Sequence, residues 1–130
     1  SGYQAAILAR LVRSVVSIEF RPSLAARARK TLTRLGIPNV TVLDGDGSDG
    51  APVFSPYDAI VVAAGAPAVP PDLLSQLSKR GKMVVPVGTT DLQHLTFLRR
   101  SGQSLNEEVR ESCVFVPLVG RQGWRHSGAK

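Results

Sequence analysis

Acidic residues and glycines gather where two predicted strands end, and their chemistry suits a nucleotide-like cofactor. Glu19 lies at the end of the predicted strand 15–20. Asp44-Gly45-Asp46-Gly47 follows the predicted strand 40–43. A carboxylate at such a strand end can accept hydrogen bonds from ribose hydroxyls, typically about 20 residues after a glycine-containing loop. Gly2 lies 17 residues before Glu19 and would let a ligand approach the start of the first helix.

Each of these features also has a plainer interpretation. An acid at a strand end can simply be solvated, and Asp-Gly pairs are common in turns. Gly2 alone is a weak indication, because the rest of any glycine-rich loop would precede residue 1. The Asp-Gly spacing also suggests calcium, but no twelve-residue loop closes on a glutamate, so we expect no metal site. The interpretation depends on the elements that would position these residues.

The most apolar strand of the chain is predicted at residues 59–64. Six apolar residues follow one another there without alternation, which is typical of a central strand of a parallel sheet covered on both faces. Gly65 and Pro67 end it. Ligands of open α/β sheets bind at the carboxyl ends of strands, where small residues leave room. A buried strand followed by an ordinary loop is the alternative.

The other elements alternate around this strand. In the first half of the chain, the patterns predict a helix after Gly2, a strand over 15–20, a helix from Pro22 to Gly36 and a strand over 40–43. A surface loop follows. After the central strand, the patterns predict a short helix from Pro70 to Gly81, a strand over 82–87 and a hairpin of strands 92–100 and 109–118. Pro86 favours an edge position or a strand end. We therefore expect a Rossmann-like, mostly parallel α/β sheet with an antiparallel edge hairpin. It would form a single domain over residues 1–130, with a loose tail over 121–130.

Composition excludes several classes of protein. The chain has 130 residues, of which 43% are hydrophobic, and a net charge of +6. The basic residues are scattered without interleaved aromatic residues, so we expect solvated surfaces and no nucleic-acid partner. No apolar run approaches the roughly 18 residues of a membrane span, so no membrane partner is expected. Cys113 is the single cysteine, predicted to be a buried small hydrophobe in a reducing cytoplasm. His94 lies on a predicted edge strand, and we expect no functional role for it.

Several short motifs together resemble one enzyme family. In chain order they are SGYQAA (1–6), VSIE (16–19), GDG (45–47), YDAI (57–60) with AP (66–67), GKMVVPVG (81–88) and FVPLVG (115–120). Their order and spacing, across nearly the whole chain, are similar to those of the protein-L-isoaspartate O-methyltransferases, which are class I S-adenosylmethionine-dependent methyltransferases. The Pro-Val-Gly and Pro-Leu-Val-Gly pieces are more specific to this family than to methyltransferases at large.

The resemblance implies a function and a set of site residues. The family methylates the carboxylate of isoaspartyl residues in damaged proteins and peptides, using S-adenosylmethionine as cofactor. Gly2 would be the last glycine of the cofactor loop, Glu19 would hold the ribose hydroxyls and Phe20 would lie against the adenine. Asp46 and Gly47 would meet the adenine edge. Ala64 to Pro67 would border the methionine part and the peptide.

The resemblance also implies that the family's N-terminal segment is missing here. That segment carries a Thr-Ile-Ser motif, the first strand and most of the glycine-rich loop. The first strand would lie between strand 15–20 and the central strand, so its absence leaves a gap of unpaired backbone, which is costly when buried. Three explanations are possible. Either those two strands pair directly, or another chain fills the gap by self-association, or the sequence is a fragment of a longer protein.

The sequence is compatible with three hypotheses about function. The first is a truncated isoaspartyl methyltransferase domain, whose activity as a truncated chain is open. The second is a non-catalytic interaction module or swapped dimer built on the same fold. The third, a nicotinamide dehydrogenase, shares the β/α order and the acid but gives no reason for the Pro-Leu-Val-Gly ending.

Overall fold

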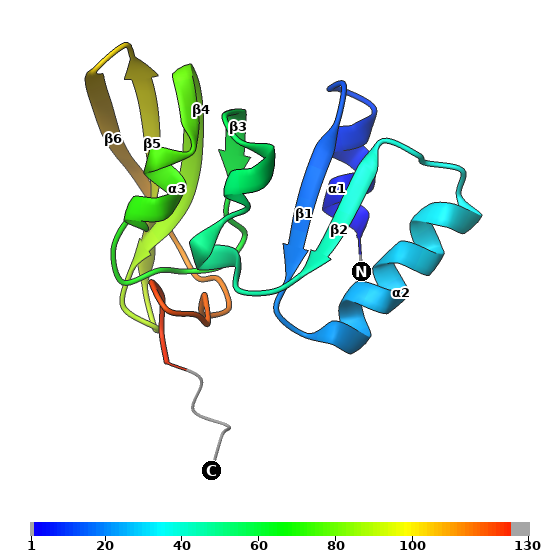
Figure 1. The fold of residues 1–130 in the computed structure, drawn as a ribbon. Coiled ribbons are helices and arrows are strands. Elements are labelled where there is room, and N and C mark those ends of the chain that lie inside the picture. The colour runs from blue at the N-terminus through cyan, green and yellow to red at the C-terminus, as the bar shows by residue number, and fades with distance from the viewer. Residues whose placement is uncertain (1, 126–130) are drawn as a thin grey trace. The chain divides into compact units, whose positions relative to one another are not determined.

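A computed structural model describes residues 2–125, and these residues form two compact units that meet in the sequence between Gly47 and Ser48. Each unit is described by itself, and Figure 1 shows their elements. The first unit has two helices and two strands: α1 (Tyr3–Ala9), β1 (Val15–Glu19), α2 (Pro22–Arg34) and β2 (Val40–Asp44). β1 and β2 pair in parallel, from Val15↔Val40 to Glu19↔Asp44. The predicted alternation of helix and strand is confirmed in this unit.

Helix α2 supplies most of the core of the first unit. Pro22 occupies its first turn, where a missing N–H is harmless. Ala25, Ala28 and Leu32 are buried against Val42 of β2. Gly36 follows the helix with φ +69°, a left-handed conformation that favours glycine. Leu35 follows the last residue of the helix, Arg34, and is 59% exposed.

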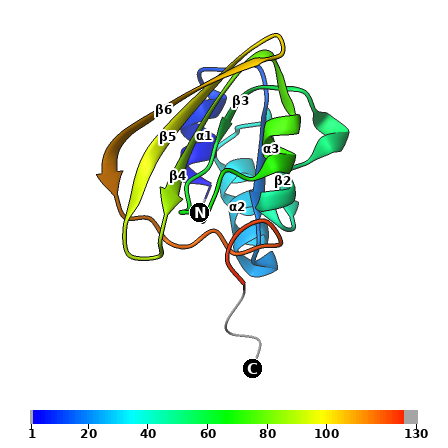
Figure 2. The same cartoon turned by 90° about the vertical axis from the view of Figure 1, so that its left-hand side faces the viewer.

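The second unit is built on a four-stranded sheet in the order β3-β4-β5-β6. After the short turns η1 (Gly47–Asp49) and η2 (Pro52–Phe54), its elements are β3 (Tyr57–Val61), α3 (Pro71–Ser75), β4 (Leu77–Gly88), β5 (Gln93–Ser101) and β6 (Ser104–Cys113). β3 and β4 pair in parallel, whereas β5 and β6 continue the sheet antiparallel. Figure 2 shows this hairpin running alongside β4. The α/β class and the antiparallel edge hairpin are confirmed.

The core of the second unit lies on one face of this sheet. Its buried members are Ala66, Leu73, Leu77, Met83, Val85 and Leu98. Ile60 of β3 packs against them, but Val61 is 43% exposed. The prediction that this strand is buried on both faces is therefore wrong. β3 is an edge strand of its sheet, paired only with β4 among the described residues.

Strand β4 is longer and more central than its sequence suggests. Residues 79–81, expected to end the preceding helix, belong to β4, and α3 ends at Ser75. Pro86 is buried in a strand with neighbours on both sides. Its carbonyl accepts a hydrogen bond from the Ala66 N–H at 2.8 Å, so its nitrogen faces the side on which β3 has already ended. Pro86 is thus tolerated away from a sheet edge.

The second strand of the hairpin begins earlier than predicted. We expected it over 109–118, but β6 spans Ser104–Cys113. Gly102, with φ +64°, makes a turn tight enough for Ser101 to pair with Ser104. Cys113, expected to be buried, is only half-buried at the strand end. The apolar residues after it do not join the hairpin, and Val116 is 71% exposed.

The segment after the hairpin is held by specific contacts. Residues 121–124, expected to begin a loose tail, bond instead to other parts of the second unit. Arg121 pairs with Asp49 and Asp72, and the Trp124 ring N–H donates to the Gly65 carbonyl at 3.0 Å. Residues 126–130 of the predicted tail lie outside the described residues.

Tyr57 connects β3 to the turn before it, and its hydroxyl donates to the Ala51 carbonyl at 2.7 Å. Replacing Tyr57 by phenylalanine should lower the free energy of unfolding by about 1 kcal/mol at neutral pH. Burial raises the pKa of Tyr57 above its ordinary value of 10.0. Its contribution is therefore complete below that value and is lost as the pH rises through the folded-state pKa.

Urea unfolding of the wild type and the Tyr57→Phe variant, at neutral pH and in alkali, measures both effects. The difference between the two proteins should shrink in alkali. A difference that grows with pH would contradict this account of Tyr57.

Candidate functional site

Glu19 and the loop after β2 lie side by side at the carboxyl ends of β1 and β2. Glu19 is the register partner of Asp44. The Gly45 N–H donates to the Glu19 carbonyl at 3.0 Å, which continues the pairing by one residue. Asp46 lies two residues beyond Asp44. The structure therefore brings together two predicted site residues, Glu19 and Asp46.

The Glu19 side chain is oriented by its own backbone neighbourhood. Its Oε1 accepts a hydrogen bond from the Arg21 N–H at 3.2 Å. This bond lies at the turn from β1 into α2, where Phe20 is 42% exposed. A carboxylate at a strand end can accept hydrogen bonds from hydroxyl groups. A partly exposed aromatic ring beside it can cover one face of a ligand's ring.

Asp44 has a structural partner that the sequence did not indicate. The Arg29 Nη2 donates to the Asp44 Oδ1 at 2.8 Å and to the Val42 carbonyl at 2.8 Å. No local pattern in the sequence indicates that Arg29 contacts a residue 15 positions away. This pairing fixes the start of the loop, so Asp46 is the better candidate for contact with a ligand.

Two glycines shape the backbone of this unit. Gly2 precedes α1 with φ +83°, and a Cβ added there would lie 3.4 Å from the Ala28 Cβ. Gly2 therefore combines a left-handed turn with close packing against α2. A Cβ added at Gly47 would meet nothing within 4 Å. The space beside Gly47 is thus open to a ligand.

Ala64 belongs to the second unit, at the loop that follows β3. The next residue, Gly65, is tightly held: its N–H donates to the Val116 carbonyl and its carbonyl accepts from the Leu118 N–H, both at 2.8 Å. Gln93, which is 1% exposed, packs against Gly65 and accepts the Phe115 N–H at 2.7 Å. Sequence reasoning missed Gln93 and Trp124, because their partners are distant in the chain.

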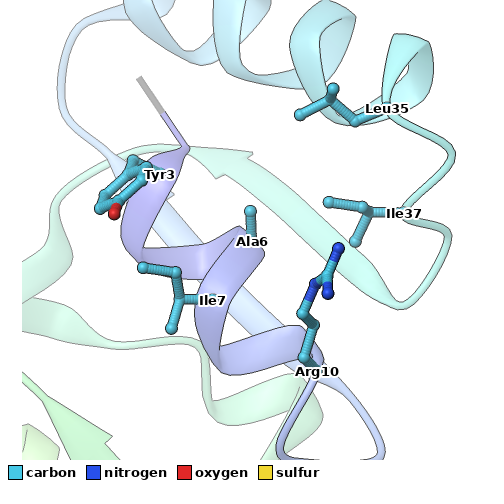
Figure 3. Close-up of a pocket in the computed structure, with 6 residues that line it drawn as sticks. All are labelled: Tyr3, Ala6, Ile7, Arg10, Leu35 and Ile37. Carbon is cyan, nitrogen blue, oxygen red and sulfur yellow. The ribbon is translucent and has the colours of Figure 1, made fainter.

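A separate hollow in the first unit lies beside α1. Its volume is about 240 Å³, and it is lined by Tyr3, Ala6, Ile7, Arg10, Leu35 and Ile37 (Figure 3). The lining contains no carboxylate and none of the predicted site residues. The chemistry described above therefore favours the strand ends over this hollow as the candidate site.

Comparison with known proteins decides the family. The family model for protein-L-isoaspartate(D-aspartate) O-methyltransferase matches residues 1–123. The chain belongs to the protein-L-isoaspartate O-methyltransferase family. A protein-L-isoaspartate O-methyltransferase from Methanoregula boonei is 48% identical over 126 residues, which cover 97% of this chain and 58% of that relative. The chain thus spans a little over half the length of the curated relatives it matches.

Solved structures of the family have the same fold. One protein-L-isoaspartate O-methyltransferase is 33% identical, with a TM-score of 0.86 over 94% of this chain and 40% of that one. A putative protein-L-isoaspartate O-methyltransferase from Plasmodium falciparum, in complex with S-adenosyl-L-homocysteine, has a TM-score of 0.70 at 21% identity, covering 82% of this chain and 52% of that one. The Rossmann-like α/β fold expected from the sequence is confirmed. Among residues 2–125, no helix is both long and apolar enough to cross a membrane.

Proposed function

We propose that the protein transfers a methyl group from S-adenosylmethionine to the carboxylate of isoaspartyl residues in damaged proteins and peptides. Membership of the isoaspartyl methyltransferase family supports this reaction. The observation that carries the proposal is the register pairing that sets Glu19 beside the Asp44–Gly47 loop. These are the positions at which the family resemblance requires an acid and a GDG motif.

The residues of the first unit fit the adenosine part of the cofactor. We assign the ribose hydroxyls to the Glu19 carboxylate, one ring face of the adenine to Phe20, and the adenine edge to Asp46. The open space at Gly47 would let the base come close to the backbone. Gly2 would adjoin the cofactor at the start of α1, and Ala64 would border its methionine part. The bound cofactor supplies an electrophilic methyl group on a sulfonium.

The proposed reaction requires little acid–base catalysis by the protein. A carboxylate with a pKa of about 4 is already ionised at neutral pH, so no strong general base is needed. Catalysis is then mostly the positioning of the substrate oxygen in line with the methyl group. The resulting methyl ester would close to a succinimide with loss of methanol, and addition of one water would reopen the succinimide partly to normal aspartate. We therefore assign no catalytic side chain.

A methyl-transfer assay with matched peptides tests the proposal. The chain is incubated with S-adenosylmethionine and either an isoaspartyl peptide or the same peptide with normal aspartate, and S-adenosylhomocysteine is quantified. Product from the isoaspartyl peptide alone supports the proposal. Equal turnover of both peptides would contradict it. A folded chain that does not bind S-adenosylhomocysteine would favour a non-catalytic interaction module.

The proposal also covers location, domain organisation and self-association. We propose a cytoplasmic protein, because its single cysteine suits a reducing compartment. We also propose that both units belong to one methyltransferase domain. Self-association is proposed through unpaired strand edges, since β1 and β3 each pair with one strand among the described residues. Sedimentation velocity over a range of concentrations measures this self-association.

A further inference from the structure

Three Asp-Gly pairs occur within the seven residues 44–50. In such a pair the glycine nitrogen, unhindered by a neighbouring Cβ, can attack the aspartate side-chain carbonyl carbon. A nitrogen–carbon bond forms, one water leaves, and the product is a succinimide. Addition of one water to its main-chain carbonyl then gives an isoaspartyl residue. No reagent other than water is needed, so the local structure decides which pair reacts.

In the third pair, Asp49-Gly50, the aspartate side chain is held by hydrogen bonds from residues 121 and 122. The Asp49 Oδ1 accepts hydrogen bonds from the Arg121 Nε at 3.0 Å and Nη2 at 2.7 Å, and from the Gln122 Nε2 at 3.4 Å. The Asp49 carbonyl accepts from the Gln76 Nε2 at 2.9 Å. Both the side chain and the backbone of Asp49 are therefore restrained.

Residues 121 and 122 are themselves anchored to other parts of the second unit. Arg121 also donates to the Asp72 Oδ2 at 2.8 Å. Gln122 receives the Asp72 N–H on its Oε1 and donates its own N–H to the Ser48 Oγ, both at 3.0 Å. The segment thus bridges Ser48 and Asp49 to the start of α3, and its position does not depend on Asp49 alone.

We propose that Asp49-Gly50 is a latent isoaspartyl-forming site, which Arg121 and Gln122 protect from succinimide formation. Cyclisation requires the Asp49 carboxyl carbon to swing onto the Gly50 nitrogen, and the bonds at Oδ1 must break first. The proposal concerns the protein's own ageing and is independent of cofactor binding. Only its corollary, that the aged chain becomes a substrate of the same kind of methyl transfer, rests on the proposed function.

Replacing Arg121 by alanine tests the protection. The ion pair between Arg121 and Asp49 is exposed and therefore weak, so isoaspartate at position 49 should form only about two to five times faster than in the wild type. The protein is aged at neutral pH in ¹⁸O-water, and isoaspartate at each of the three pairs is quantified by peptide mass spectrometry. One ¹⁸O atom per isoaspartyl residue identifies the succinimide route.

Two controls keep the result interpretable. Position 44, whose carboxylate is bound by Arg29 in the first unit, should not respond to Arg121→Ala. Arg110→Ala removes an arginine of β6 that pairs with Glu108, and should leave position 49 at the wild-type rate. Arg121→Lys, which keeps one cationic donor, should give an intermediate rate. Equal rates at position 49 in the wild type and both Arg121 variants would overturn the proposal.

Discussion

Replacing Glu19 by alanine is expected to weaken binding of S-adenosylhomocysteine by about 10- to 150-fold. A hydrogen bond to a charged group contributes about 1.5–3 kcal/mol, which corresponds to that range of affinity. The side chain lies at the end of β1, where its Oε1 accepts a long, exposed hydrogen bond of 3.2 Å from the Arg21 N–H. Its removal should therefore change affinity far more than it changes stability. Isothermal titration calorimetry measures the affinity.

Two variants serve as controls for Glu19. Glu19→Gln keeps an acceptor oxygen but loses the charge, so its affinity should fall between those of the wild type and Glu19→Ala. Glu107→Ala removes an exposed acid from β6 and should bind as the wild type does. Equal affinity of the wild type and Glu19→Ala would remove Glu19 from the site.

Replacing Gly65 by alanine is expected to lower the free energy of unfolding of the second unit by about 2–6 kcal/mol. The added Cβ would lie 2.7 Å from the Gln93 Cδ. Gln93 cannot move without losing its bonds to the Thr89 carbonyl and the Phe115 N–H. A buried polar group left without a partner costs about 1–3 kcal/mol, and Gln93 has two such groups.

The matched control for Gly65→Ala is Gly47→Ala. A Cβ at Gly47 meets nothing within 4 Å, so this variant should be about as stable as the wild type, while the proposed site predicts weaker cofactor binding. Urea unfolding followed by the fluorescence of Trp124, which bonds to Gly65, measures the second unit. Equal destabilisation by the two substitutions would contradict the packing argument.

Local patterns in the sequence were sufficient where each element depends on its own residues. Pro22 and Gly36 delimit α2, and the acid at position 19 falls at a strand end as predicted. These features follow from backbone preferences and from the burial of one helix face. The family motifs added the expected roles of the site residues, which a fold alone does not supply.

The sequence could not reveal features that depend on distant partners. Residues 79–81 resemble a basic helix end, but pairing within the sheet extends β4 through them. The run 59–64 is apolar enough for a central strand, yet β3 lies at the edge of its sheet. Gln93 and Arg121 act on residues 22 or more positions away. Tertiary contacts override local preference at each of these places.

The central claim is that the strand ends of the first unit form the adenosine site. The most direct test is to record amide ¹H–¹⁵N spectra of the chain as S-adenosylhomocysteine is added. We expect the largest shifts at Gly2, Glu19, Phe20, Asp46 and Gly47. A folded chain whose spectrum does not change, or changes only in β5 and β6, would contradict the claim.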